Sequence, residues 1–322
     1  MKTTVIHHSA DFDGIFCREI ARKFLPDAEL IGWDFGDKPL EIPPEGQIYI
    51  LDLSVDRVFG FNLATSEPTR FVSHEVQNRI IWIDHHKSSI ESHPANIAGY
   101  RIDGVAACRL AWQWFAAHER CAHFAEQHPG ELPCKTQYID RTVHEPLAVR
   151  LAGEYDIWDK RDPQAEVFQF GLRSRDLTPS DWSELLSEKI IPATAGTGMD
   201  ISETDLLTSS LLQDGRLLQR YQQAQDASVA NHRSFMVEFE GLKFLALNTA
   251  RCNSLTFASK DIPETGHDAL MGFYWTGKAF KVSLYHAKHR TDIDLSQIAV
   301  KHGGGGHRGA CGLETYSLPF IP

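Results

Sequence analysis

Aspartate and histidine side chains follow apolar runs at several separate places in this sequence. The segments are His7-His8-Ser9-Ala10-Asp11-Phe12-Asp13-Gly14, Leu51-Asp52-Leu53-Ser54, Trp82-Ile83-Asp84-His85-His86-Lys87 and Glu154-Tyr155-Asp156-Ile157. Carboxylates and imidazoles together suit divalent ions, and the mixed donor set favours manganese over magnesium or calcium. Two such ions roughly 3.5–4 Å apart can activate a water molecule and stabilise the charge on a phosphoryl group. The pattern therefore predicts a two-metal site for the hydrolysis of phosphate esters or anhydrides.

Three of the four segments also have a simpler explanation when they are taken alone. An aspartate such as Asp11 can cap the following helix by accepting its free backbone N–H groups. Spacing alone leaves capping and metal binding open for the first segment. The third segment is different, because Asp84 with two imidazoles is costly to bury without a partner ion. The four segments together offer enough ligands for two ions that share a bridging carboxylate.

A run of glycines near the C-terminus is followed directly by basic side chains. Its order is Gly303-Gly304-Gly305-Gly306-His307-Arg308-Gly309. Glycines let a backbone approach a ligand closely and turn its N–H groups toward phosphate oxygens, and His307 and Arg308 add donors. A flexible hairpin loop is the alternative. The adjacent histidine and arginine favour an anion-binding site.

Short strands and helices are expected to position these side chains. Apolar runs predict strands at 3–7, 47–51 and 79–83, and helical spacing predicts helices at 14–25, 106–126 and 143–157. Strands whose C-terminal ends carry polar groups indicate a parallel sheet with its site along that edge. Further along, the patterns predict a long helix at 206–232, strands at 235–240, 243–247, 269–275 and 279–284, and a helix at 294–301.

These elements predict an α/β fold with two domains, as the length of 322 residues also suggests. Residues 1–190 form the predicted parallel-sheet domain, 191–232 a helical linker, and 233–322 a smaller mixed-sheet domain. We expect the active site in the cleft between the two domains.

Charge and cysteine content narrow the classes of partner. The formal net charge of −11 opposes binding of long duplex DNA, which depends on many Lys and Arg contacts to phosphate. The six cysteines are scattered, as expected for reduced thiols in the cytoplasm. The N-terminus resembles no signal peptide, and no apolar run is long enough to predict a membrane span.

The ordered motifs HHSADFDG, LDLS, IDHHKS, the acid at Asp156 and GGGGHRGACG resemble the DHH phosphoesterases, in particular their oligoribonuclease (nanoRNase) branch. The resemblance covers nearly the whole chain. It implies a DHH catalytic domain followed by a DHH-associated substrate-binding domain. It also implies two divalent ions, expected to be Mn²⁺ with Mg²⁺ or Co²⁺ as alternatives, and the metal ligands His7, Asp11, Asp13, Asp52, His85 and Asp156, with Asp52 as the bridge.

The resemblance also implies roles around these ligands. Asp84 would orient its neighbours and His86 would contact the scissile phosphate, which makes them the predicted catalytic residues. The family spacing H-x-x-x-D-x-D is met by His7 and not by His8, and neighbouring branches vary at this point. The predicted substrate-binding residues are Gly304, Gly305, Gly306, His307 and Arg308. Relatives often carry a small residue or proline at the position of Arg308, so its side chain either adds a charge contact or points away.

Three functions follow from this resemblance. The main hypothesis is a phosphodiesterase for short RNA or linear dinucleotides, with nucleoside 3′,5′-bisphosphate as a further substrate. The alternatives are an inorganic pyrophosphatase or short-chain polyphosphatase, which shares the metal set, and a nucleotide sensor without turnover. The expected partners are the short RNA or dinucleotide substrate, with no membrane and with a homodimer left open.

Overall fold

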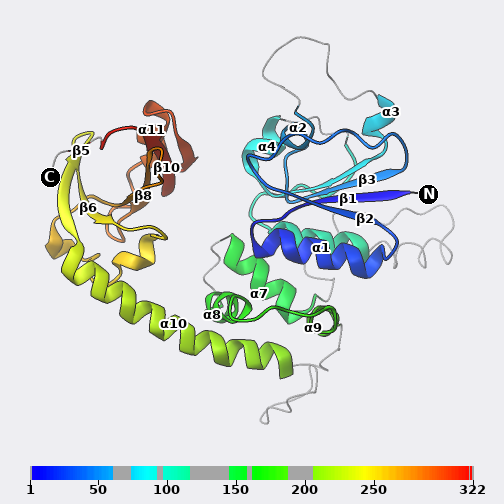
Figure 1. Cartoon of the computed structure of the whole chain (residues 1–322), viewed down its shortest axis with the longest axis horizontal. Coiled ribbons are helices and arrows are strands. Elements are labelled where there is room, and N and C mark those ends of the chain that lie inside the picture. Colours follow the sequence, from blue (N-terminus) through cyan, green and yellow to red (C-terminus); the bar gives the residue numbers. More distant parts are fainter. Residues whose placement is uncertain are drawn as a thin grey trace. The chain divides into compact units, whose positions relative to one another are not determined.

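The chain divides into two compact units, and each is described by itself. The computed structural model describes residues 2–60, 74–92, 97–116, 145–157, 162–187, 206–318 and 320. The units are Met1–Arg216 and Leu217–Pro322, and the division falls inside the long helix α10 (Leu206–Arg233), which runs along the lower part of Figure 1. The predicted boundary at residue 190 lies outside the described residues.

The first unit contains a four-stranded parallel sheet of order β2-β1-β3-β4. Its strands are β1 (Thr3–His8), β2 (Glu29–Trp33), β3 (Gln47–Leu51) and β4 (Ile80–Ile83). In the sheet register Leu51 lies between His7 and Ile83. Because all strands run the same way, their C-terminal ends meet at one edge, and Asp52 and Asp84 follow directly at that edge.

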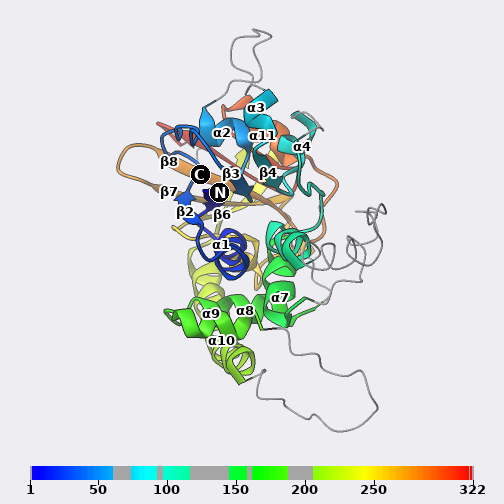
Figure 2. The ribbon, with the colours of Figure 1, turned by 90° about the vertical axis from the view of Figure 1, so that its right-hand side faces the viewer.

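Helices cover both faces of this sheet, as Figures 1 and 2 show. The helices of the first unit are α1 (Phe12–Phe24), α2 (Val55–Phe59), α3 (His74–Gln77), α4 (Lys87–Ser92), α7 (Leu147–Asp156), α8 (Gln164–Leu172), α9 (Pro179–Leu185) and residues 107–116. Alternation along β1 sends Val5 into the core beneath α1 and Ile6 into the core on the α2 side. The predicted parallel α/β layer is confirmed.

The second unit contains a six-stranded mixed sheet of order β5-β6-β7-β8-β10-β9. Its strands are β5 (Phe235–Phe239), β6 (Leu242–Asn248), β7 (Ala269–Trp275), β8 (Phe280–His286), β9 (Gly305–His307) and β10 (Ala310–Thr315). The pairing of β6 with β7 is parallel and the other pairings are antiparallel. The 3-10 helices Ser254–Phe257 and Pro263–Thr265 and helix α11 (Leu295–Lys301) complete the unit, and α11 packs on the core through Leu295 and Ala299. This confirms the predicted mixed sheet.

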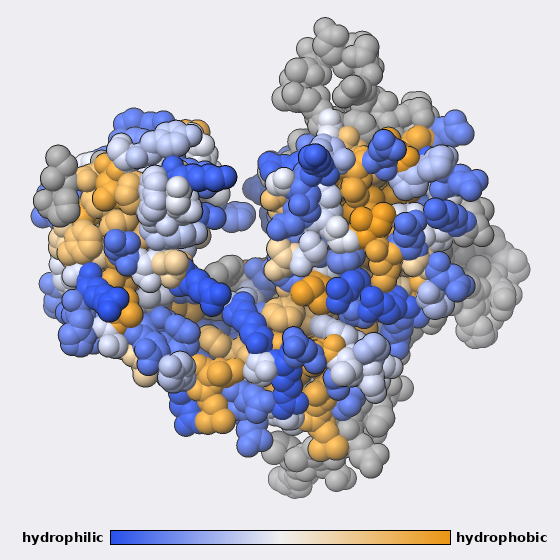
Figure 3. Space-filling view, in the orientation of Figure 1, coloured by the Kyte–Doolittle hydropathy of each residue, from blue (hydrophilic) through white to orange (hydrophobic). Residues whose placement is uncertain are grey.

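The exposed surface carries scattered apolar side chains. Figure 3 shows hydrophilic residues over much of one face, with apolar residues among them. On α10, Leu206, Leu217 and Tyr221 are 60%, 58% and 65% exposed. Apolar atoms normally make up over half of a folded protein's surface, so these side chains need no partner to explain them. Of the helices in the described residues, none combines the length and apolar content needed to cross a membrane.

Candidate metal centre

The centre is built around Asp52, which follows β3 at the carboxyl edge of the parallel sheet. Its backbone N–H donates to the carbonyl of Ile83 at 2.9 Å, and its φ of 60° is left-handed. Aspartate is one of the few residues with a side chain that tolerates this conformation, because its short carboxylate can form hydrogen bonds with nearby groups. The side chain is buried, with 1% of the residue exposed. A buried carboxylate needs compensating positive charge.

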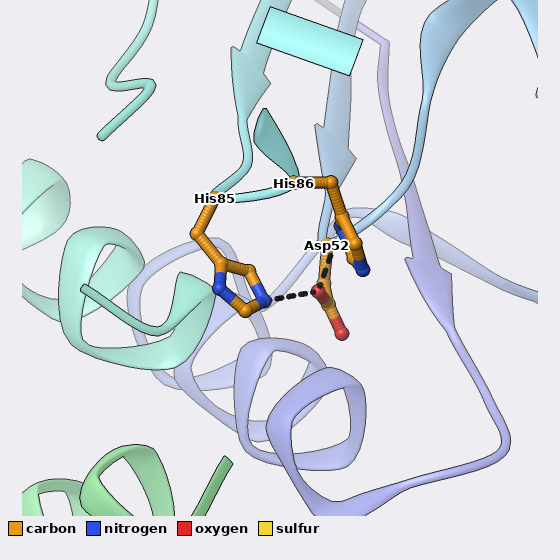
Figure 4. A group of neighbouring side chains, drawn as sticks. All are labelled: Asp52, His85 and His86. Atoms are coloured by element: carbon orange, nitrogen blue, oxygen red, sulfur yellow. Dashed lines mark ion pairs between the residues drawn. The ribbon is translucent and has the colours of Figure 1, made fainter. Parts of the chain in front are cut away.

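Two histidines supply that charge from opposite sides of Asp52. Nδ1 of His8 lies 3.4 Å from Oδ2 of Asp52, and Nε2 of His85 lies 3.4 Å from Oδ1. Figure 4 shows His85 and His86 converging on the same carboxylate. Neither Oδ1 of Asp52 nor Nδ1 of His8 has a hydrogen-bond partner of normal geometry within the described part of the chain, although both atoms are buried. Buried ligand atoms without such a partner fit a cation-binding site.

Each histidine is part of a separate group of possible ligands. Nδ1 of His8 lies 3.1 Å from Oδ2 of Asp11, so that His8, Asp11 and Asp52 form one group. Nε2 of His85 lies 3.6 Å from Asp13 and 3.3 Å from Asp156, and these residues form another. The side chains come from the ends of β1, β3 and β4, the start of α1 and the last turn of α7. Carboxylate and imidazole donors in these numbers suit divalent transition metals.

Capping and ligand geometry coexist at the start of α1. Oδ1 of Asp11 accepts a 3.0 Å hydrogen bond from the N–H of Gly14 as the helix cap, while Oδ2 faces His8. Asp13 accepts from the N–H groups of Ala107 and Cys108, at 2.9 Å and 2.7 Å, where the helix 107–116 begins. Asp11 therefore caps the helix through one oxygen, and its other oxygen stays directed at His8, so capping does not exclude metal binding.

The protonation of the centre reflects its crowding. Burial lowers the pKa of His8, but the carboxylates of Asp11 and Asp52 outweigh it and raise the pKa to about 11. Burial likewise lowers the pKa of His85, and Asp52, Asp13 and Asp156 raise it to about 10. The metal-free centre therefore holds protons on both imidazoles at neutral pH. Because metal ligands must be deprotonated, a divalent ion would replace these protons.

The carboxylates respond unequally to the same surroundings. Burial raises the pKa of Asp13 well above its ordinary value, and the charges of Asp52 and Asp156 add to this. Burial also raises the pKa of Asp156, to about 6, partly offset by His85. Burial acts in the same direction on Asp52, but its contacts with His8 and His85 outweigh it and lower its pKa. Of these three carboxylates, Asp52 is thus the one whose pKa is lowered.

Asp84 and His86 lie beside the centre in the arrangement expected for positioning. Oδ1 of Asp84 accepts from the backbone N–H groups of His85 and His86, at 2.8 Å and 3.2 Å, and contacts Nδ1 of His86 at 2.7 Å. This contact fixes the tautomer of His86 with the proton on Nδ1, which leaves Nε2 for a ligand. Asp84 is fully buried, whereas the His86 side chain is 37% exposed.

The structure brings His8 to the centre and places His7 elsewhere. The Nδ1–H of His7 donates to the carbonyl of His8 at 2.7 Å, and burial is the main cause of its lowered pKa. Among the described residues His7 belongs to no group of possible metal ligands. Alternation along β1 is the physical reason, because His7 shares the face of Val5 under α1 while His8 shares the other. The family spacing therefore indicated His7, whereas in the structure its neighbour His8 contacts Asp11 and Asp52.

Two residues that follow β2, Asp34 and Phe35, also border the centre, and no sequence motif pointed to them. Oδ1 of Asp34 lies 3.1 Å from Nε2 of His8. A carboxylate on one ring nitrogen fixes the histidine tautomer and leaves the other nitrogen free to bind a metal. Strand β2 was not predicted from the sequence, and without that strand neither residue could be placed beside the centre.

The predicted substrate-binding residues form a hairpin in the second unit. Gly306 and His307 of β9 pair with Cys311 and Ala310 of β10. A Cβ on Gly304 would lie 2.1 Å from the carbonyl oxygen of Gly312, and Gly306 has a φ of 131°. The hairpin itself therefore requires glycine at these two positions.

Gly305 differs from its neighbours in this hairpin. A Cβ added there would meet no atom within 4 Å. His307 and Arg308 are exposed, and the Arg308 guanidinium donates to the backbone carbonyl of Asp292. The side chain of Arg308 is thus already engaged with its own unit, while the open side of Gly305 and the His307 side chain remain available to a ligand.

Comparisons with known proteins give distant structural neighbours. No protein-family model and no curated relative matches the sequence. The pGpG-specific phosphodiesterase PggH from Vibrio cholerae is 12% identical, with a TM-score of 0.45 over 98% of this chain and 94% of that chain. A DHH domain from a member of a family of ribosomal proteins is 13% identical, with a TM-score of 0.48 over 98% and 83%.

RecJ from Thermus thermophilus in complex with Mn²⁺ is 14% identical, with a TM-score of 0.45 over 98% of this chain and 49% of that chain.

Proposed function

We propose that this chain is a divalent-metal-dependent phosphodiesterase that hydrolyses short oligoribonucleotides or linear dinucleotides, with Mn²⁺ as its metal. The observation that supports this most is the position of Asp52, whose two carboxylate oxygens each lie 3.4 Å from a different imidazole. A carboxylate between two sets of donors suits the bridge of a two-metal site. Nucleoside 3′,5′-bisphosphate is a further candidate substrate.

The proposed ligands follow two of the groups of possible ligands in the described residues. Asp52 would bridge, His8 and Asp11 would complete one set, and Asp13, His85 and Asp156 would complete the other. His8 here replaces His7 of the set that the family spacing implied. Bound ions would supply an activated water molecule and positive charge for the phosphoryl group.

The chain's own groups have distinct tasks in this proposal. Asp34 holds His8 through Nε2. Once Nδ1 of His8 is deprotonated, its lone pair can bind an ion together with Asp11 and Asp52. Asp84 holds His86 through Nδ1, and Nε2 of His86 can then donate to an oxygen of the scissile phosphate once the ring is protonated. The hydrogen bond that His86 donates to Asp84 raises the pKa of His86, which favours that charged form.

The choice of short nucleotides over other phosphates has two supports. The net charge of −11 disfavours long polyanions, which must gather many cationic contacts. The glycine hairpin with His307 offers backbone N–H groups and an imidazole rather than the cluster of basic side chains that a bare diphosphate would need. Diphosphate and short polyphosphate therefore serve as the competing substrates in the test.

The test is a substrate panel with chelated protein and added metals. It contains pApA, RNA of two to ten nucleotides, cyclic dinucleotides, pAp and diphosphate, each with Mn²⁺, Mg²⁺, Co²⁺ or no metal, and products are separated by chromatography. We expect hydrolysis of pApA and the shortest RNA with Mn²⁺ and none after chelation. Preferential hydrolysis of diphosphate would replace the proposal by the pyrophosphatase alternative. Binding of nucleotides without any turnover would support the sensor.

A further inference from the structure

Phe35 lies against two histidines of the candidate centre and is still open to solvent. Its ring centroid is 5.3 Å from that of His8 and 6.3 Å from that of His86, with interplanar angles of 63° and 76°. It is 42% exposed, although most large apolar side chains near the sheet are buried. An aromatic ring therefore borders the groups that would hold a phosphate.

The backbone around Phe35 is fixed by the residue that also holds His8. Oδ1 of Asp34 accepts from the N–H of Phe35 at 2.7 Å and contacts Nε2 of His8 at 3.1 Å. The N–H of Asp34 in turn donates to Oδ2 of Asp37 at 2.9 Å. Gly36 completes the turn with a φ of 111°, a conformation that favours glycine. The position of Phe35 is thus coupled to that of a proposed ligand.

Side chains from two other elements support the ring. The buried Trp33 at the end of β2 meets it edge-on at 5.8 Å, and the Arg57 guanidinium from α2 lies 5.5 Å from its centroid. An arginine beside an aromatic ring adds cation–π attraction and a positive charge. A ring that is supported in this way and exposed on its remaining surface has the form of a stacking platform.

We infer that Phe35 stacks against a nucleobase of the substrate whose phosphate binds at the metal centre, with Arg57 adding positive charge at the same place. Stacking on an aromatic side chain is tolerant of base identity, because every base has a π-face. This inference rests on the proposed function for the position of the phosphate. It goes further by making Phe35 a residue that selects nucleotides, since diphosphate and polyphosphate carry no base.

Substitutions at Phe35 separate stacking from simple apolar cover. Phe35→Leu keeps an apolar side chain over His8 and His86 but removes the ring, and Phe35→Trp keeps a larger ring. Tyr316→Leu is the matched control, because Tyr316 is an aromatic residue of the second unit with 88% exposure. Mn²⁺ titration of each variant should match that of wild type, which would show that the centre itself is unchanged.

The first readout compares pApA with an analogue in which hydrogen replaces both bases. For pApA, Phe35→Leu should lower kcat/KM by about tenfold, within the range of stacking energies on aromatic side chains. Phe35→Trp should keep most of the activity, and the base-free analogue should be cut equally by all variants. An equal loss on both substrates would mean that Phe35 only covers the histidines, and the inference would fail.

The second readout does not depend on turnover. Calorimetry measures the binding of AMP and of ribose 5-phosphate in the presence of Mn²⁺. We expect wild type to favour AMP and Phe35→Leu to lose that preference. If wild type cuts no nucleotide but binds AMP through Phe35, the proposed function fails and the inference stands. If wild type cuts pApA and Phe35→Leu leaves both preferences unchanged, the inference fails and the proposed function stands.

Discussion

The carboxyl edge of the first sheet and the glycine hairpin of the second sheet offer opposite kinds of chemistry. At the edge, the buried Asp52 and the partly buried His85 carry the charge, and each depends on its neighbours for compensation. At the hairpin, exposed backbone groups and the exposed His307 side chain would contact a ligand. Gly304 and Gly306 are required there by the backbone of the hairpin itself. Substitutions in the first region should therefore abolish chemistry, whereas those in the second should change binding.

The largest expected effect is at Asp52. Asp52→Asn keeps the shape and the left-handed backbone but removes the charge that would bridge two ions, so kcat for pApA should fall on the order of 10³-fold or more. Calorimetry with Mn²⁺ should also show fewer bound ions than wild type. Asp27→Asn, at an exposed position of the same unit, is the control and should behave as wild type. Full activity of Asp52→Asn would refute a two-metal site centred on this residue.

The comparison is sharpened by the neighbouring histidines of β1. His8→Ala should weaken Mn²⁺ binding by about 10- to 100-fold or more, a range already seen when residues that support metal ligands are lost. His7→Ala should leave Mn²⁺ affinity nearly unchanged, because its imidazole bonds to the His8 carbonyl and faces α1. Calorimetric titration of both variants decides the order. A larger loss in His7→Ala would restore the assignment based on family spacing.

At the hairpin, the expected effect is on substrate binding. His307→Ala should raise KM for short RNA by about one to two orders of magnitude, corresponding to a lost charge-assisted contact of about 1.5–3 kcal/mol. Arg308→Ala should change KM by no more than about threefold, because its guanidinium already bonds to the Asp292 carbonyl. Hydrolysis of bis-p-nitrophenyl phosphate, which lacks the nucleotides that the hairpin would bind, should be unchanged in both. Wild-type KM and wild-type length preference in His307→Ala would make the hairpin purely structural.

The smallest expected effect is the dependence of Mn²⁺ affinity on pH, with the release of protons on metal binding. His8 and His85 have pKa values of about 11 and about 10, so both are protonated at pH 7 and must lose their protons to bind a metal. Mn²⁺ affinity should therefore rise as pH increases from 6 to 8, and calorimetry in buffers of different ionisation enthalpy should show proton release. The hairpin contains no such pair, so Arg308→Ala should leave this release unchanged. Metal binding without proton release would contradict the protonated state of the metal-free centre.

The same protonation affects the stability of the metal-free protein. For His8 and His85 the folded pKa is above the unfolded one, so their contribution is fully present below the unfolded pKa near 6.5 and is lost as pH rises through about 10 to 11. Asp156, with a pKa raised to about 6, adds a loss of stability as pH rises from about 4 to 6. Thermal unfolding of chelated protein across this range measures the sum.

Much of the fold could be predicted because its strands are short apolar runs with polar ends. The predicted strands at 47–51 and 269–275 coincide with β3 and β7, and the helix predicted at 206–232 ends within one residue of α10. Strand β2 was missed because Glu29–Trp33 has only exposed or partly buried residues before its last position and no clear alternation. Strand β9 was missed because glycines carry no side-chain pattern.

The candidate centre was predictable in type but not in its last details. The acids at 11, 13, 52 and 156 and His85 meet as the strand ends implied. The alternation that places Val5 and Ile6 in opposite cores, and His8 beside Asp11 and Asp52, is visible only once the sheet is formed. Asp34 and Phe35 could not be found, because their role depends on pairing of β2 with β1, which is a contact between segments distant in sequence.

The left-handed backbone at Asp52 restricts any redesign of the metal preference. Glutamate would keep the carboxylate oxygens and cysteine would offer sulfur, but both would be strained at a φ of 60°. Histidine tolerates this conformation but carries no negative charge. Glycine and asparagine accept the conformation and carry no charge. Backbone shape and ligand charge are thus met together by a single amino acid at this position, so variation in metal selectivity would have to come from the histidine and aspartate positions around it.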